Sequence, residues 1–275
     1  MGVAIPSALI LRLGQAAVAI TCEDEQDARA LRGYFYHCQE RTPGPPPQVR
    51  YHVTHPSVVQ WRIYRDDVLL SEPIYKQEVA EALMQDFTSC LIDGNAQQAA
   101  LHAACLARAG QAVLVPAVSG SGKSTLAAWL LSRGWEYLTD ELVLFDPHSG
   151  VVQGLPRPLA LKKGSADLGR AWFPSAVRTE FPLRAVWIDP GKVVEQALAA
   201  LLVFPNFQPG QVFQVQALSR AEAVFELLRA LVNARHLPNS GLVAMGALAQ
   251  RAPAFRLTYG ALDETAADWF AGYAG

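Results

Sequence analysis

Short runs of alternating apolar and polar residues dominate the first hundred positions, with glycine, proline or aspartate between them. This pattern predicts elements in the order β-β-α-β-β-α. The predicted strands lie at 8–13, 16–21, 49–54 and 59–64, and the helices begin near Asp24 and cover about 76–92. Residues 42–47 include three consecutive prolines, which cannot continue a helix, so we expect an extended connector there. The order is typical of a small α+β domain, which we place at residues 1–98.

Longer apolar runs, broken by glycine and proline, begin at residue 99. They predict buried strands, and helical spacing of apolar residues follows further along the chain. The predicted strands are 99–107, 111–116, 135–139, 142–145 and 255–259, with a proline-interrupted strand-like segment at 155–161. The predicted helices are 126–131, 220–233, 240–251 and 263–272. Alternating strands and helices indicate an α/β domain at residues 99–275.

Composition narrows the class of protein. The chain has 275 residues, of which 51% are hydrophobic and 17% charged, and this excludes a disordered chain. The net charge of -2 does not indicate a general binder of nucleic acid or anionic membranes. No apolar run reaches the roughly 18 residues of a membrane span, and the N-terminus lacks the basic region of a signal peptide. We therefore expect a cytoplasmic protein, whose 4 cysteines, without metal or redox spacing, are reduced thiols.

The strongest chemical signal is a strand, a loop of small residues and a helix in direct succession. The strand ends near Pro116, and the loop with the start of the helix reads Ser119-Gly-Ser-Gly-Lys-Ser-Thr125. The segment matches the phosphate loop G-x-x-x-x-G-K-[ST], except that Ala117 replaces the first glycine. The alternative is a Gly/Ser hairpin loop with an incidental lysine, and the order of the elements argues against it.

Each residue type in this loop suits the binding of a nucleotide. Glycines let successive backbone N–H groups turn toward phosphate oxygens, and the following helix adds its positive dipole end. Lys123 would reach the β- and γ-phosphates, and the Ser124 hydroxyl would complete a Mg²⁺ shell. The residues predicted to bind ATP are Ser119, Gly120, Ser121, Gly122, Lys123, Ser124 and Thr125.

An acidic pair, Asp140-Glu141, follows the predicted strand 135–139, and Asp140 lies 17 positions after Lys123. A helix of about three turns and a crossover fit this gap. We therefore expect Asp140 on a strand next to the phosphate loop, at the carboxyl end where α/β proteins bind ligands. The short spacing indicates a compact kinase arrangement. The alternative is a pair of acidic residues that caps a strand end.

These motifs resemble the HPr kinase/phosphorylase family, and more closely its HPr-kinase-related bacterial relatives, which include kinases of lasso-peptide precursors. The resemblance covers roughly residues 100–260. It is carried by Leu101-His102, Ser119–Thr125, Arg133-Gly134, Thr139-Asp-Glu141, Leu155-Pro-Arg-Pro-Leu-Ala-Leu-Lys162, Val203-Phe-Pro205 and Pro209-Gly210. It implies a P-loop kinase core with a mixed sheet and flanking helices, preceded by the small α+β domain.

The resemblance also implies roles for five residues. Asp140 is the catalytic base that receives the proton of the acceptor hydroxyl, and Glu141 helps to hold the metal through water. Arg157 and Lys162 approach the transferring phosphoryl group, with solvated surface bases as the alternative. His102 lies in an apolar context, so a core role and a phosphate-facing role both stay open.

The chain departs from the family pattern in places. The usual Asp-Asp pair is Asp140-Glu141 here, and the later segment associated with phosphorylase activity is not found. Residues 178–192 lack the basic, glycine-containing pattern of close relatives, so no acceptor contacts are assigned there.

The leading hypothesis is an ATP- and Mg²⁺-dependent kinase of a Ser or Thr hydroxyl in a peptide or small protein. One alternative is a kinase of a small hydroxylated metabolite, and another is a nucleotide-binding regulatory module with little turnover. The N-terminal domain is assigned to acceptor recognition. Nucleic acid and membrane are not expected partners, and the sequence leaves a homo-oligomer open.

Overall fold

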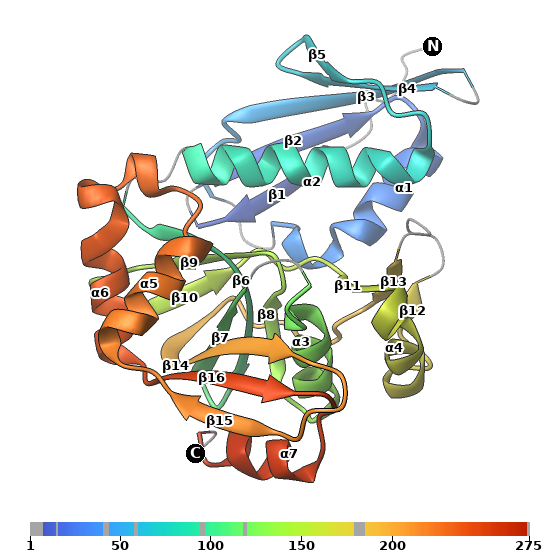
Figure 1. The fold of residues 1–275 in the computed structure, drawn as a ribbon. Helices are drawn as coiled ribbons and strands as arrows, with labels where there is room; N and C mark the ends of the chain where they lie inside the picture. The colour runs from blue at the N-terminus through green and yellow to red at the C-terminus, as the bar shows by residue number, and fades with distance from the viewer. Residues whose placement is uncertain are drawn as a thin grey trace. The chain divides into compact units, whose positions relative to one another are not determined.

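The computed structural model describes residues 8–14, 16–40, 44–57, 60–93, 97–117, 120–178 and 185–273 (Figure 1). The chain divides into two compact units. The first comprises Met1–Gly94 and Arg178–Leu183, and the second comprises Asn95–Val177 and Arg184–Gly275. That residues 1–98 and 99–275 are separate folding domains stays a prediction.

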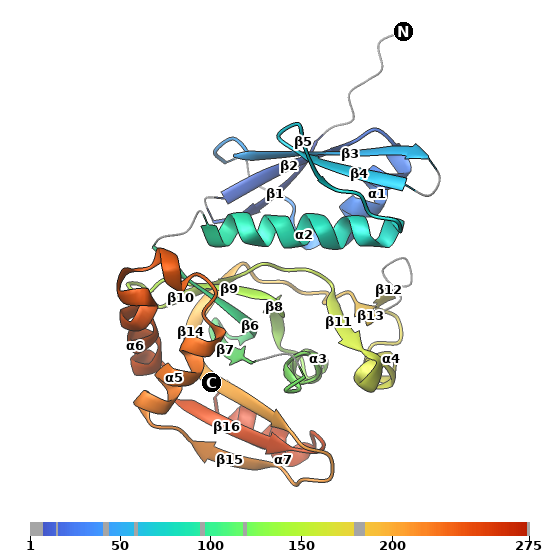
Figure 2. The same cartoon turned by 45° about the horizontal axis from the view of Figure 1, so that its top comes forward.

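The first unit is a mixed sheet in the order β1-β2-β3-β4-β5 with two helices. Its elements are β1 (Leu9–Leu13), β2 (Ala16–Cys22), α1 (Glu25–Tyr34), β3 (Val49–Ser57), β4 (Gln60–Arg65), β5 (Val68–Ser71) and α2 (Lys76–Asp93). β1 and β2, which match the predicted strands 8–13 and 16–21, pair antiparallel, and α1 connects β2 to the parallel strand β3. Figure 2 shows α2 along one face of this sheet. The sequence pattern does not predict β5, because its apolar residues follow one another without alternation. In the structure Val68, Leu69 and Leu70 are all exposed.

The second unit contains an 8-stranded mixed sheet, in the order β10-β9-β6-β7-β14-β16-β15 with β8 also paired to β6. The elements after residue 97 are β6 (Ala99–Arg108), β7 (Gln111–Pro116), α3 (Lys123–Ser132), β8 (Glu136–Thr139), β9 (Leu142–Phe145), β10 (Val151–Gly154), β11 (Leu159–Lys162), α4 (Ala166–Trp172), β12 (Val177–Arg178), β13 (Ala185–Ile188), β14 (Gln196–Phe207), β15 (Gln214–Ala217), α5 (Arg220–Ala230), α6 (Leu242–Arg251), β16 (Ala254–Tyr259) and α7 (Glu264–Ala271). β11 and β13 pair antiparallel in a separate three-stranded sheet. The expectation of an α/β architecture with mixed sheets is confirmed.

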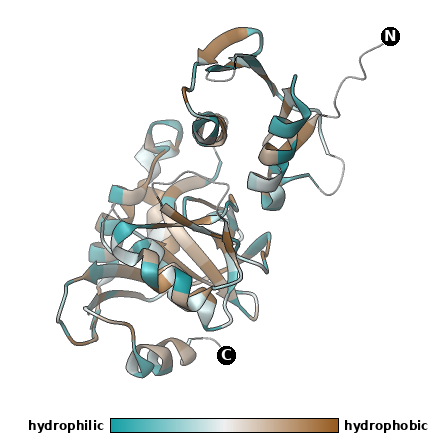
Figure 3. Cartoon of the chain, turned by 90° about the vertical axis from the view of Figure 1, so that its right-hand side faces the viewer, coloured by the Kyte–Doolittle hydropathy of each residue, from teal (hydrophilic) through white to brown (hydrophobic). Residues whose placement is uncertain are grey.

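Helices cover both faces of the large sheet, and two apolar clusters fill the layers between (Figures 1 and 3). On one face, Leu227 of α5 and Leu248 of α6 pack in a cluster with Leu202 of β14. On the other face, Leu126 of α3 and Phe270 of α7 belong to a cluster with strand residues of β7 and β16. Burial of these apolar side chains is the main term that stabilises the layers.

Strand order corrects one expectation about the site. β7, β14 and β16 run parallel, so their carboxyl ends lie at one edge of the sheet. β6 is antiparallel to both β7 and β8, and it pairs with β8 through Cys105–Ala107. β8 is therefore parallel to β7 but separated from it by one strand, because the hairpin partner β6 occupies the adjacent position. Asp140 still follows the carboxyl end of its strand, as predicted.

Several elements of the second unit are not apparent from the sequence. The long strand β14 contains the apolar run of residues 197–204, which fits a buried helix equally well. The segment 155–161 forms a strand only from Leu159 onward, after the second of its prolines. In the part of the chain that the structure describes, no helix has the length and apolar content of a membrane span.

Candidate functional site

The loop after β7 has the backbone of a tight turn into a helix. Gly120 and Gly122 have φ of 89° and 96°, a left-handed conformation that favours glycine. Gly122 is the N-cap of α3, which begins at Lys123, three residues before the predicted helix at 126–131. A Cβ atom on Gly122 would lie 2.7 Å from the Tyr259 hydroxyl, so the position has no room for a side chain. Of the predicted loop residues, Ser119 lies outside the described residues.

Two neighbouring strands hold the loop in place. The backbone N–H of Phe207, at the end of β14, donates to the Ser121 carbonyl at 3.1 Å. The Tyr259 hydroxyl, at the end of β16, donates to the Gly122 carbonyl at 3.4 Å. Burial raises the pKa of Tyr259, so this hydroxyl keeps its proton. The two strand ends therefore fix the loop at the carboxyl edge of the sheet.

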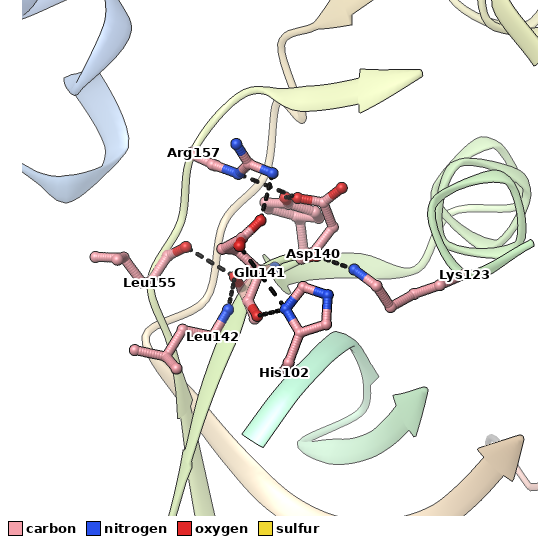
Figure 4. A network of polar contacts seen from close by, with 9 residues as sticks. His102, Lys123, Asp140, Glu141, Leu142, Leu155 and Arg157 are labelled. Atoms are coloured by element: carbon pink, nitrogen blue, oxygen red, sulfur yellow. Dashed lines mark hydrogen bonds and ion pairs between the residues drawn. The ribbon is translucent and has the colours of Figure 1, made fainter. Parts of the chain in front are cut away.

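Lys123 points from the start of α3 toward the acidic pair (Figure 4). It is only 8% exposed, and its ammonium group donates to the backbone carbonyl of Asp140. Burial lowers the pKa of Lys123, and the charges of Arg157 and Lys162 lower it further, whereas Asp140 and Glu141 oppose this shift. The fold thus brings together the two residues on which the kinase hypothesis depends most.

A buried hydroxyl fixes the turn that carries Asp140 and Glu141. Thr139 is 0% exposed, and its Oγ1 donates to the Leu155 carbonyl at 2.8 Å. The same oxygen accepts hydrogen bonds from the backbone N–H groups of Glu141 at 3.0 Å and of Leu142 at 3.3 Å. Thr139 therefore connects the acidic turn to the segment that leads to Arg157.

Arg157 lies between the two carboxylates (Figure 4). Its Nη2 donates to Glu141 Oε2 at 2.5 Å, and its Nε lies 3.4 Å from Asp140 Oδ1. The guanidinium carbon is 5.7 Å from the centre of the Trp187 ring. On the other side of the pair, the buried Tyr137 hydroxyl donates to Asp140 Oδ1 at 3.4 Å. Asp140 is 1% exposed, and these groups offset the cost of burying its charge.

His102 belongs to the same network. Its Nδ1 lies 3.1 Å from the Glu141 carbonyl oxygen and 3.7 Å from Glu141 Oε1. Burial lowers the pKa of His102, and the nearby charge of Lys123 acts in the same direction. The ring is therefore neutral at pH 7. Whether it faces a phosphate group stays a prediction.

The remaining predicted residues lie around this centre. Ser124 and Thr125 are half-buried in the first turn of α3. Lys162 is exposed at the end of β11, where its charge still acts on Lys123. Among the described residues, no group of three or more His, Cys, Asp or Glu side chains could hold a metal ion.

Three residues of this network are not among the predicted site residues. They are Thr139, Tyr137 and Trp187. Thr139 adjoins the acidic pair in the Thr-Asp-Glu motif, which is the one local signal. The partners of the other two depend on the folded chain.

Comparisons with known proteins give a distant likeness. No protein-family profile and no curated protein matches the sequence. Among solved structures, the chain is similar to the HPr(Ser) kinase/phosphatase from Coxiella burnetii, with a TM-score of 0.30 and 12% sequence identity. The match covers 62% of this chain and 95% of that chain. A likeness at this level assigns no residue, so the chemistry of the site rests on its own geometry.

Proposed function

We propose that this protein is an ATP-dependent kinase that transfers the γ-phosphoryl group to a Ser or Thr hydroxyl of a peptide or small protein. The observation that carries the proposal is the contact between the Lys123 ammonium and the Asp140 carbonyl at the N-terminus of α3. It supports the pairing of a phosphate-binding lysine with a nearby general base, and transfer to a hydroxyl needs both.

The loop after β7 is the proposed binding site for the phosphates of ATP. N–H groups at a helix N-terminus, together with the helix dipole, favour bound anions. The left-handed glycines let the backbone approach phosphate oxygens closely. Lys123 is the ammonium that would contact the β- and γ-phosphates, and its burial strengthens its electrostatic effect.

The acidic pair is the proposed site of reaction with the acceptor hydroxyl. We assign Asp140 as the base and Arg157 as the charge that stabilises the transferring phosphoryl group, with Lys162 further out. Arg157 ion-pairs with both carboxylates, which supports a location within reach of the reacting atoms.

A magnesium ion would come with the nucleotide. Mg²⁺ is usually bound by substrate phosphates, water and one or two protein oxygens. The Ser124 hydroxyl and the Glu141 carboxylate are oxygen donors of the kind that Mg²⁺ prefers. Ser124 would hold the ion directly and Glu141 would hold it through water, and the ion would neutralise charge on the phosphates.

The first experiment tests the loop. Lys123→Ala removes the buried ammonium, and Lys163→Ala removes an exposed one as the matched control. Isothermal titration calorimetry with Mg-ATP should give binding to the wild type and to Lys163→Ala, and strongly weakened binding to Lys123→Ala. Equal ATP affinity in all three proteins would refute the phosphate-loop assignment.

The second experiment identifies the class of acceptor. Transfer of radiolabel from γ-labelled ATP is measured for Ser- and Thr-containing peptides and for hydroxylated metabolites. Labelled peptide supports the proposal, and labelled metabolite supports the metabolite kinase. ATP binding with neither product nor stimulated hydrolysis points to the regulatory module.

A further inference from the structure

The direction of the bound nucleotide follows from the strand order, once the proposed function is accepted. Asp140 follows β8, on one side of the loop strand β7, whereas β14 and β16 lie on the other side. A base must lie near the γ-phosphoryl group, so the γ end of the polyphosphate lies toward β8. The α end, with the nucleoside attached, then lies toward the carboxyl ends of β14 and β16.

A cavity of about 680 Å³ adjoins the loop and extends to the β14 and β16 side, and His102 of the acidic network also lines it. Its walls include Ala117, Gly120 and Ser121 of the loop, Asn206 and Phe207 of β14, and Arg256 of β16. Ligand pockets for molecules of nucleoside size fall in the range of about 300 to 1,000 Å³. The cavity is formed by the second unit alone and adjoins the phosphate loop directly.

Phe207 presents an unusual surface at this place. Its side chain is 45% exposed, although it lies at the edge of a polar site. The ring centre is 6.0 Å from that of Tyr259, at an interplanar angle of 63°, so the two rings form a T-shaped aromatic contact. A Cβ atom on Gly122 would lie 3.0 Å from the Phe207 Cβ, which places the side chain beside the loop.

We propose that Phe207 is the stacking platform for the nucleobase. An aromatic face binds any base through its π-surface and needs no specific hydrogen bond. Exposure of an apolar ring beside a phosphate loop is explained if a flat, partly apolar group covers it. This proposal rests on the proposed function, because the direction of the nucleotide depends on Asp140 as the base.

The test compares a ligand that has a base with one that lacks it. Calorimetry measures the Kd of Mg-ATP and of magnesium tripolyphosphate for the wild type, Phe207→Ala and Phe207→Trp. Phe207→Ala keeps the backbone N–H that bonds Ser121, so the loop retains its support. Phe225→Ala is the matched control, because Phe225 is 65% exposed on α5 and does not line the cavity.

Phe207→Ala should raise the Kd of Mg-ATP roughly 5- to 150-fold, the range expected for loss of one stacked base, and leave that of tripolyphosphate within about twofold. Phe207→Trp should retain ATP affinity, and Phe225→Ala should change neither ligand. Unchanged ATP affinity in Phe207→Ala, or equal loss for both ligands, would overturn the platform while leaving the phosphate loop intact. Failure of the wild type to bind either ligand would instead overturn the proposed function, and the platform with it.

Discussion

The buried hydroxyl of Thr139 offers the sharpest test of how the acidic turn is held. Thr139→Val keeps the shape and the β-branch of the side chain but removes one donor and one acceptor. In the structure the donor serves the Leu155 carbonyl at 2.8 Å, and the acceptor serves the Glu141 N–H at 3.0 Å. The buried Leu155 carbonyl and the half-buried Glu141 N–H would both lie beside an apolar methyl group.

The magnitude follows from these partners. A buried polar group left without its hydrogen bond costs about 1 to 3 kcal/mol. Two such groups predict a loss of about 2 to 6 kcal/mol in the free energy of unfolding, to which the longer bond from Leu142 N–H at 3.3 Å adds little. Thr258→Val is the control, because its half-buried hydroxyl accepts a single bond from Asn206 at 3.2 Å. That change should cost no more than about 1.5 kcal/mol.

Two measurements check the Thr139 prediction. Urea unfolding gives the free energy for each variant, and hydrogen exchange read by mass spectrometry reports on the amides of Glu141 and Leu142. The two units of the chain need not unfold together, so the hydrogen exchange measurement is needed to report the stability of the acidic turn itself. Thr139→Ser should restore most of the stability and the protection. A Thr139→Val protein with wild-type stability and protected amides would refute the role assigned to this hydroxyl.

Three further predictions concern the acidic pair and its neighbour. Asp140→Asn should lower the rate of phosphoryl transfer by about 10² to 10⁴ and leave Mg-ATP binding nearly unchanged, because the substitution removes the proton-accepting charge and keeps the size of the side chain. Recovery of the transfer rate on adding excess Mg²⁺ would contradict this prediction. Glu141→Gln should raise the Mg²⁺ concentration needed for half-maximal rate, because a neutral amide binds a hard dication less well, and an unchanged magnesium titration would exclude Glu141 from the metal site. The pKa of His102 is lowered from its ordinary 6.5, so the unfolded chain binds this proton more readily than the folded chain does. The contribution of His102 to the free energy of unfolding is therefore fully present above pH 6.5 and is lost as the pH falls further. His102→Gln should flatten the loss of thermal midpoint between about pH 7 and 5, and a slope equal to that of the wild type would contradict the shift.

The turn from β7 into α3 could be predicted from sequence because its determinants are local. Gly120, Gly122 and Lys123 lie within four positions, and their roles depend on backbone conformation and on the start of a helix. The predicted helix at 126–131 begins at Lys123 in the structure, as the motif requires. The strands with clear alternation or short apolar runs could also be predicted, because their signal lies within a few consecutive residues.

The strands and contacts that surround the loop could not be predicted in this way. β14 lies beside β7 although some 80 residues separate them, and its apolar run has no period that distinguishes strand from helix. The ring of Trp187 near Arg157 depends on the pairing of β11 with β13. Such partners are set by topology, which a single sequence constrains only loosely.

The separation of β7 from β8 by β6 has a consequence for how the two halves of the site stay aligned. No backbone hydrogen bond joins the loop strand to the strand that carries Asp140, since β6 pairs with both. Alignment between Lys123 and Asp140 therefore depends on side chains: the lysine that bonds the Asp140 carbonyl, the threonine beneath the turn and Arg157 across the two carboxylates. The first of these contacts is part of the loop motif, and the other two come from the Thr-Asp-Glu turn and from a segment that lies 16 residues further along. In the proposed kinase, the loop motif alone would bind phosphate, whereas transfer to a hydroxyl would require all three contacts to hold Asp140 in place.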